Sequence, residues 1–239
     1  MNGFLGAVGF LTRIPVSIGT ADVAPSVKWF PIVGLGIGVP SGLAYWAVSG
    51  PLGSQVAAVL AVALAVAITG AFHEDGLADT FDGLSSIRSR ERQLEIMKDS
   101  RLGTFGASAL VLVLLARVVL VARLPGTAAT VGDLAWAHGV SRSVVIGVMC
   151  VATPAAADGS GVAYLSELRR GPALVLAVAV ATAGWLIAGE RALLAVALAT
   201  VGSFVVWRWA HRRIGGVTGD VLGACQQVGL VGVLVALAA

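Results

Sequence analysis

The chain has little charge and almost no cysteine for its length. Only 12% of its 239 residues are charged, whereas 57% are hydrophobic, and the mean hydropathy is +0.91. A soluble domain usually carries about twice that share of charged residues. The two cysteines, Cys150 and Cys225, lie in apolar surroundings without a CxxC pair or a histidine at ligand spacing. This placement predicts two buried cysteines and argues against a disulfide framework.

A basic stripe is also missing. The net charge is +3, and the sixteen basic residues are scattered along the chain, so we predict no binding to nucleic acid. We find no basic n-region followed by a compact apolar core and a small-residue cleavage site, so we expect no cleavable signal peptide. Insertion into a membrane would then depend on internal spans.

Long apolar runs with few charges are what the chain has instead. Seven of them approach the roughly 20 residues that cross a bilayer. Their predicted ranges are 31–49, 52–72, 103–122, 134–152, 172–189, 192–207 and 217 to the C-terminus, with a tight turn at Gly50 and Pro51 after the first. Residues 1–30 contain Pro15 and Pro25 and are predicted to form an interfacial segment with a short helix. The fold class predicted is all-α: a polytopic helical membrane protein of about six to seven transmembrane helices, with residues 1–239 as a single integral membrane domain.

Basic residues predict the orientation of these spans. If 1–30, 73–102, 153–171 and 208–216 share one side, that side carries twelve Lys and Arg, whereas the opposite connections carry two. Cytoplasmic loops are enriched in Lys and Arg, so the first set is predicted to face the cytoplasm. The expected location is a bacterial cytoplasmic (inner) membrane, with the lipid bilayer as a partner. The sequence leaves open whether the protein forms a homo-oligomer.

Acidic residues concentrate in one of the predicted cytoplasmic segments, between His73 and Arg101. Seven of the thirteen acids lie there. They are Glu74, Asp75, Asp79, Asp82, Glu91, Glu95 and Asp99. Carboxylates next to a bilayer are costly without a partner, and a divalent metal ion with phosphates is the partner that this composition favours.

Three of these acids share one helical face. Asp75, Asp79 and Asp82 are spaced i, i+4 and i+7, which aligns them along a helix. Without a cation they would repel one another, whereas Mg²⁺ binds hard oxygen ligands and typically combines one or two carboxylates with substrate phosphates. We therefore predict a Mg²⁺ site on Asp75, Asp79 and Asp82, with Asp99 and Glu74 as further metal ligands.

Residues outside this stripe are candidates for binding the substrate. Lys98, Arg101, Arg13 and Arg142 could bind phosphate groups, although Arg142 lies within a predicted span and could form a structural ion pair instead. Thr218 and Asp220 precede the last span, where Asp220 could cap a helix or reach the metal or a substrate hydroxyl. Glycines next to the acids would allow a ligand or another helix to come close. They are Gly76, Gly83, Gly103 and Gly106.

Three segments together resemble a known family. They are His73 to Gly83 (HEDGLADTFDG), Met97 to Gly106 (MKDSRLGTFG) and Gly216 to Ala224 (GVTGDVLGA). With the opening Thr12 to Pro15 and Phe30 to Gly34, they are similar to the cobalamin-5′-phosphate synthases, which are adenosylcobinamide-GDP ribazoletransferases. The resemblance covers nearly the whole chain in the expected order. One departure is at Gln226 and Gln227, where members of that family often carry an acid.

The resemblance implies a multi-pass, Mg²⁺-dependent transferase of vitamin B12 assembly. Its substrates would be adenosylcobinamide-GDP and α-ribazole or α-ribazole 5′-phosphate, and GMP would leave. The general-base role is assigned to Asp82 with Asp79 as the second catalytic carboxylate, because the incoming ribose hydroxyl needs a base or a metal to activate it.

Two alternatives remain open. A CDP-alcohol phosphatidyltransferase also uses an aspartate-rich motif on membrane helices, but Asp79 stands here where that family has arginine. An ion or metal transporter would also place carboxylates in a membrane. However, the spans predicted at 172–189 and 192–207 contain no acid that would continue a path.

Overall fold

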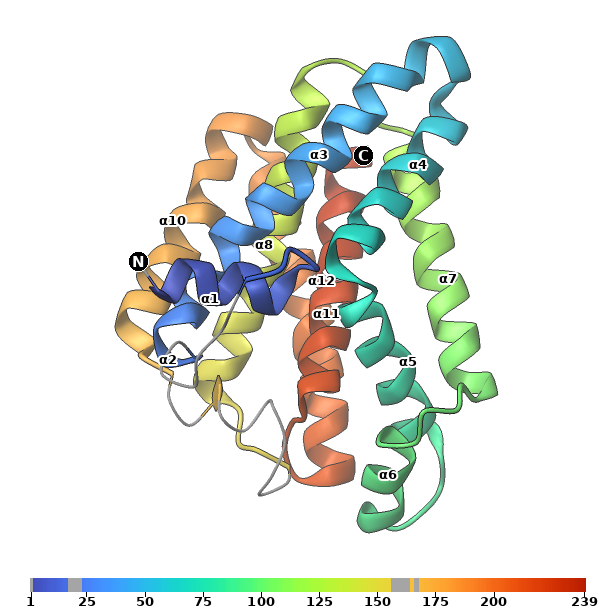
Figure 1. Cartoon of the computed structure of the whole chain (residues 1–239), viewed down its shortest axis with the longest axis vertical. Helices are drawn as coiled ribbons and strands as arrows, with labels where there is room; N and C mark the ends of the chain where they lie inside the picture. The colour runs from blue at the N-terminus through green and yellow to red at the C-terminus, as the bar shows by residue number, and fades with distance from the viewer. Residues whose placement is uncertain (1, 17–22, 156–163, 166–167) are drawn as a thin grey trace.

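The protein is a bundle of long helices (Figure 1), seen in a computed structural model that describes residues 2–16, 23–155, 164–165 and 168–239. Within these residues the structure contains helices and one isolated bridge, between Pro154 and Val217. The helices in chain order are α1 (Asn2–Leu11), α2 (Val23–Ser26), η2 (Val27–Trp29), α3 (Phe30–Leu52), α4 (Ser54–Thr69), α5 (Phe72–Ser85), α6 (Arg90–Met97), α7 (Thr104–Val121), α8 (Ala129–Val151), α10 (Arg170–Ala188), α11 (Arg191–Ile214) and α12 (Gly219–Ala238). The all-α prediction is confirmed.

The number of spans also agrees with the prediction. Among the residues that the structure describes, six helical stretches are long and apolar enough to cross a membrane, and the bent pair α4 and α5 would make a seventh span. In Figure 1 the α3–α4, α7–α8 and α10–α11 turns lie toward one end of the bundle with the C-terminus. Helices α5 and α6 and the α11–α12 turn lie toward the other end. The chain is therefore a multi-pass membrane protein whose acidic segment lies at one end of the bundle.

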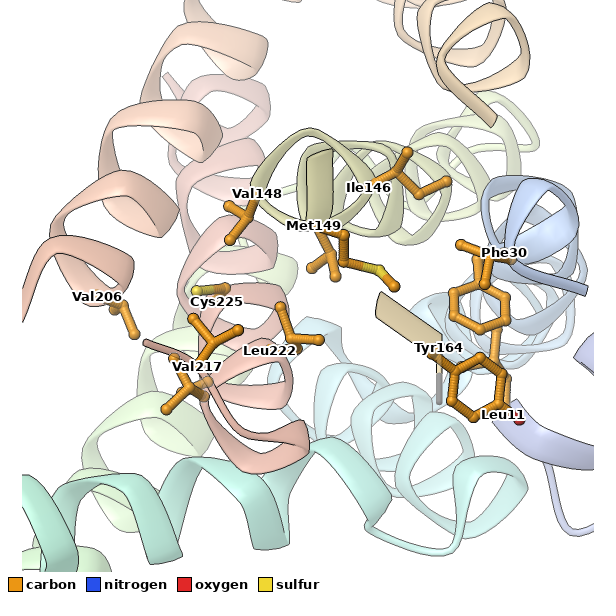
Figure 2. Packing of buried hydrophobic residues seen from close by; sticks show 14 of the residues in the cluster. Leu11, Phe30, Ile146, Val148, Met149, Tyr164, Val206, Val217, Leu222 and Cys225 are labelled. Carbon is orange, nitrogen blue, oxygen red and sulfur yellow. The ribbon is translucent and has the colours of Figure 1, made fainter. Parts of the chain in front are cut away.

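Helices α8 and α12 form the centre of the bundle. In their most apolar stretches 78% and 67% of the residues are buried, compared with 22% in α7 and in α10. The outer helices instead expose large apolar side chains such as Val175 and Leu112, as expected of surfaces that face lipid. Figure 2 shows part of the interior, where Cys225 and Leu222 of α12 lie beside Val148 and Met149 of α8.

Close helix packing explains the glycines of α3. A Cβ at Gly34 would lie 2.5 Å from the carbonyl oxygen of His138, and one at Gly42 would lie 2.6 Å from the Cα of Val131. Gly38 lies equally close to the backbone of Leu134. Because these contacts all reach α8, the GxxxG spacing of Gly34 and Gly38 marks a tight helix interface.

Several predicted boundaries are wrong. The span expected over 192–207 continues as α11 to Ile214, so Arg208, Arg212 and Arg213, expected in a connection, lie on that helix. The turn expected at Gly50 and Pro51 falls later, because α3 continues to Leu52 and Gly53 makes the turn with φ +79°. The span expected over 52–72 is broken, because α4 ends at Thr69 and the chain bends by 89° before α5 begins at Phe72. Gly70 and Ala71 make the bend with φ of +65° and +60°. A positive φ is costly for alanine, so tertiary contacts must hold Ala71 in this conformation.

A carboxylate-rich candidate site at one end of the bundle

Helix α5 carries the three predicted acids on one face. Asp75 is exposed and Asp79 and Asp82 are partly exposed, whereas Leu77 and Thr80 on the opposite side are fully buried. The i, i+4, i+7 spacing therefore produces the predicted arrangement, because the amphipathic helix buries its apolar side against the bundle. Asp79 is half-buried, and the negative charges of Asp75, Asp220 and Asp82 all act on its carboxyl group.

A glycine brings Asp220 to this face. A Cβ at Gly76 would lie 2.9 Å from both the Cα and the carbonyl oxygen of Asp220, so α5 and the start of α12 pack backbone to backbone. Thr218 is the N-cap of α12: its Oγ1 accepts a hydrogen bond from the amide of Val221 (3.3 Å) and donates one to Asp220 Oδ2 (3.2 Å). Thr218 and Asp220, predicted to bind substrate, therefore lie next to the acidic stripe.

Asp82 has a structural partner. Its Oδ2 accepts a hydrogen bond from the amide of Gly103 (2.7 Å), and its Oδ1 accepts one from the amide of Gly106 (2.8 Å). These amides are at the start of α7, where backbone N–H groups lack partners within the helix. A Cβ at either glycine would clash with the Asp82 carboxylate. Gly103 and Gly106 thus allow close packing against α5, as expected, and Asp82 caps α7.

Asp99 and Arg101 pair with each other on an exposed turn. Arg101 Nη2 lies 2.6 Å from Asp99 Oδ2, and the Arg101 amide donates to Asp99 Oδ1 (3.1 Å). These hydrogen bonds lower the pKa of Asp99 to about 2. Lys98, at the end of α6, is exposed beside them. A phosphate that bound Arg101 would have to compete with Asp99.

Arg13 lies over the bend between α4 and α5. Its backbone amide donates to the carbonyl oxygen of Ile68 (2.8 Å), and its side chain covers Gly70 so closely that a Cβ there would overlap it. An open pocket of about 420 Å³ is lined by Arg13, Thr12 and Asp75, together with Phe10 and Phe72. One predicted phosphate-binding residue and one predicted metal ligand therefore share a pocket.

Glu74 has a different environment from the other acids of α5. It is 4% exposed, and its Oε1 accepts hydrogen bonds from Arg117 Nη1 (2.6 Å) and Gln227 Nε2 (3.1 Å). Arg117 Nη1 also donates to Gln227 Oε1 (3.0 Å). This buried ion pair ties α5 to α7 and α12, which is a positioning role rather than the metal-binding role expected of Glu74.

Arg142 is also buried, at 2% exposure. Its Nη1 donates to the carbonyl oxygen of His138 (3.0 Å) in the previous turn of α8, and its Nε is buried without a hydrogen-bond partner. Gln226 connects this region to the Glu74 network, because its Nε2 donates to Ser141 Oγ (2.9 Å) and its Oε1 accepts from Gln227 (3.0 Å).

Sequence reasoning missed the Arg117 to Gln227 part of this network. An arginine within an apolar span was the available signal, because a charge buried there requires a partner. The two glutamines were noted only as a departure from a family pattern, whereas they supply the hydrogen bonds that link Glu74 to Ser141.

The carboxylates offer hard oxygen donors of the type that Mg²⁺ prefers. In the part of the chain that the structure describes, no three His, Cys, Asp or Glu side chains are already arranged around a metal position. A preformed set of three is not required, since Mg²⁺ commonly takes only one or two carboxylates and completes its shell with water and substrate phosphates. The donor chemistry of Asp75, Asp79 and Asp220 therefore fits this ion.

Comparison with known proteins gives one consistent result. The family model described as cobalamin-5-phosphate synthase matches residues 3–238. The adenosylcobinamide-GDP ribazoletransferase of Escherichia coli (strain K12) is 35% identical to the chain over 242 residues, which cover 98% of each protein. The protein of the same name from Bradyrhizobium diazoefficiens is 38% identical over 239 residues, covering 98% of this chain and 92% of the relative. No solved structure matches the chain.

Proposed function

Because the chain belongs to the cobalamin-5-phosphate synthase family and is a transferase of cobalamin biosynthesis, we propose that it joins adenosylcobinamide-GDP to α-ribazole or α-ribazole 5′-phosphate. In this reaction a ribose hydroxyl oxygen attacks the phosphorus that bears the cobinamide. A new P–O bond forms between the ribose oxygen and this phosphorus. The bond from this phosphorus to the oxygen that bridges the two phosphorus atoms breaks, and GMP leaves with the bridging oxygen. The hydroxyl proton is lost in the same process.

The observation that carries this proposal is that Asp220 lies close to Asp75 and Asp79 of α5. Asp220 reaches α5 through the backbone contact at Gly76, and its charge acts on Asp79 together with that of Asp75. A dianionic diphosphate cannot approach such a surface without a cation, which explains why a diphosphate transferase would bring these acids together. Bound Mg²⁺ would be held by one or two of the carboxylates of Asp75, Asp79 and Asp220, and it would neutralise the phosphate charge and stabilise the departing group.

The remaining site residues have separate roles. We assign the proton-accepting role to Asp79, because both oxygens of Asp82 already accept hydrogen bonds from the start of α7. Arg13, which lines the open pocket with Asp75, binds a substrate phosphate. Lys98 and Arg101 lie on the same acidic segment and attract the anionic donor.

The site would face the cytoplasm of a bacterial inner membrane. The segments predicted for this side, 1–30, 73–102, 153–171 and 208–216, carry twelve Lys and Arg against two on the opposite segments, and cytoplasmic loops are the ones enriched in these residues. The diphosphate of the donor is charged, so a site open to the cytoplasm would receive the donor without a transport step.

Measurement of GMP release tests the proposed reaction. Detergent-purified protein is given adenosylcobinamide-GDP, α-ribazole and Mg²⁺, and we expect one GMP for each α-ribazole consumed. A parallel reaction receives a CDP-alcohol donor and should release no CMP. Folded protein that makes no GMP, or that releases CMP instead, contradicts the proposal.

A further inference from the structure

A surface groove adjoins the open pocket that contains Asp75. Its volume is about 540 Å³, and it lies between α1, α3 and the end of α4. Thr12 and Arg13 line this groove, and both also line the open pocket. The two spaces therefore meet just after α1, next to the bend between α4 and α5.

The groove is mostly apolar and open. Val8 of α1 and Ile32 of α3 line it, and Phe4 and Ile14, which also line it, are 39% and 55% exposed. Along α3 the groove extends from Ile32 to Pro40, which is about 12 Å of helix. Because the groove is open at the surface, a ligand larger than its volume can enter it by one edge.

Gly36 and Pro40 give the α3 wall of the groove a free acceptor. Gly36 is exposed, and nothing lies within 4 Å of a Cβ at this position, so the absence of a side chain leaves space for a ligand. Pro40, one turn later within the helix, has no N–H. The carbonyl oxygen of Gly36 therefore lacks the donor that a regular helix would supply. A ligand with N–H groups can pair with this oxygen, whereas a hydrocarbon chain cannot.

Arg13 supplies a positive charge where the groove and the open pocket meet. Among the described residues, the ion pairs involve other arginines. The hydroxyl group of Thr12 already donates to the carbonyl oxygen of Val8 (2.7 Å). The guanidinium group of Arg13 is therefore the polar group that can bind a phosphate at this junction.

Two other spaces fit a substrate less well. The space lined by Phe10, Arg142 and Leu222 has a volume of only about 50 Å³, which is too small for a substrate. A groove of about 360 Å³ is lined by α8, α10 and α11, and it shares no residue with the open pocket. The groove at Arg13 combines a larger volume with continuity to the carboxylates.

We propose that this groove binds one edge of the donor's corrin ring, an inference that rests on the proposed function. A short linker joins the corrin to the attacked phosphorus. A donor whose diphosphate lies at Arg13 and Asp75 must therefore place its corrin beside the open pocket. The periphery of a corrin carries methyl groups, which pack against the apolar lining, and amide groups, one of which donates to the Gly36 carbonyl oxygen.

Filling the groove at Gly36 tests this assignment. Gly36→Leu is expected to fold, because nothing lies within 4 Å of a Cβ there and leucine favours a helix. The dissociation constant of adenosylcobinamide, which carries the corrin but no GDP, should rise about tenfold or more, because the new side chain occupies the ligand's space. Equilibrium dialysis read by the visible absorption of the corrin measures it.

Gly50→Leu is the matched control for this variant. Gly50 is on the same helix and outside the groove, and nothing lies within 4 Å of a Cβ there either. Its affinity for adenosylcobinamide should equal that of the wild type. An equal loss of affinity in Gly50→Leu would overturn the assignment.

Turnover gives a second measurement. Gly36→Leu should raise KM for adenosylcobinamide-GDP while KM for α-ribazole and kcat stay unchanged, because the corrin is bound equally in the ground state and the transition state. Equal increases in both KM values would indicate a general distortion of the site and would overturn the assignment.

The Gly36 carbonyl oxygen is tested with a corrin whose amides are replaced by methyl esters, which have no N–H. Wild-type protein should bind adenosylcobinamide about three- to tenfold more tightly than the ester form, the effect of one hydrogen bond. Pro40→Ala restores an N–H to the helix and should lose this preference. Pro51→Ala, also within α3 but outside the groove, should retain it. A preference that persists in Pro40→Ala overturns the role of this oxygen.

The results separate the groove from the reaction. If wild-type protein releases GMP and Gly36→Leu binds adenosylcobinamide unchanged, the groove assignment is overturned and the transferase is intact. A loss of co-purified phospholipid in that variant would then identify a lipid as the occupant. If wild-type protein binds adenosylcobinamide, Gly36→Leu does not, and no GMP forms, the proposed reaction alone is overturned. Wild-type protein that does not bind adenosylcobinamide overturns the groove assignment.

Discussion

At the scale of single residues, the acids of α5 differ in function because they differ in environment. Asp75 is exposed and Asp79 partly exposed, Asp82 accepts two backbone hydrogen bonds, and Glu74 is buried against Arg117. These differences lead to separate predictions for residues within nine positions of one another.

Asp79→Asn should reduce turnover by about 10²–10⁴-fold, the contribution typical of a general base, while thermal unfolding in detergent stays close to that of the wild type. The charge is lost at a partly exposed position, so little packing changes. Asp133→Asn is the control, since Asp133 lies near the start of α8 and outside the site. Near-normal GMP release by Asp79→Asn would remove it from the mechanism.

Glu74→Gln should instead lower stability. Loss of one partner from a buried ion pair typically costs about 3–5 kcal/mol, because the other charge stays buried. The midpoint of thermal unfolding should fall, and part of the loss should be recovered when Arg117→Gln is added. Glu95→Gln breaks an exposed pair with Arg92 and should change little. If the losses from Glu74→Gln and Arg117→Gln simply add, the two side chains are not coupled.

At the scale of helices, the sequence predicted which segments are helical better than it predicted where each helix begins and ends. The acidic stripe of α5 was predictable because its spacing follows the helical period, and α7 and α10 follow from apolar runs of about the length of a span. The bend at Gly70 and Ala71 could not be predicted, because alanine rarely adopts a positive φ and its presence does not indicate a turn. The partners of Glu74 were hidden for another reason: Arg117 and Gln227 are 43 and 153 positions away in sequence, and only the packed bundle brings them together.

The cap that Asp82 makes on α7 gives a prediction at this scale. Asp82→Ala should speed hydrogen exchange of the Gly103 and Gly106 amides and destabilise the protein by about 0.5–2 kcal/mol, the usual effect of losing an N-cap. Ser89→Ala removes the N-cap of the exposed helix α6 instead and should leave the exchange of these amides unchanged. Unchanged exchange in Asp82→Ala, with turnover abolished, would return Asp82 to the role of general base.

The contact between α5 and α12 gives a second prediction. Gly76→Val should lower GMP release because its side chain would force the Asp220 backbone away from α5. Gly147→Val on α8 is a matched control, since nothing lies within 4 Å of a Cβ at Gly147. Equal activity of the two variants would show that Asp220 need not lie against α5.

At the scale of the whole molecule, the bundle brings together at one end residues that belong to distant segments of the sequence. Helices α5 and α6 and the start of α12 share that end (Figure 1), and the basic residues of α6 and of the last turns of α11 lie there too. The charge distribution along the chain was sufficient to predict this grouping. The open pocket beside Asp75 could not be predicted, because Phe10 and Phe72 carry no pattern that distinguishes them from core residues.

Thiol labelling tests the orientation. In a background without Cys150 and Cys225, Ile87→Cys should be protected from a membrane-impermeant reagent in intact spheroplasts, and Leu52→Cys at the α3–α4 turn should react. Both side chains are exposed, at 94% and 53%, so access to the reagent depends on the side of the membrane. The reverse pattern would place the carboxylates outside the cytoplasm.

The central claim is that Asp75 and Asp79 hold a divalent cation together with the donor's diphosphate. Electron paramagnetic resonance of Mn²⁺, used in place of Mg²⁺, tests it most directly with purified protein and adenosylcobinamide-GDP. We predict that wild-type protein binds Mn²⁺ in the presence of the donor, and that Asp75→Asn with Asp79→Asn abolishes the binding while the fold is retained. Undiminished Mn²⁺ binding by that double variant would contradict the claim.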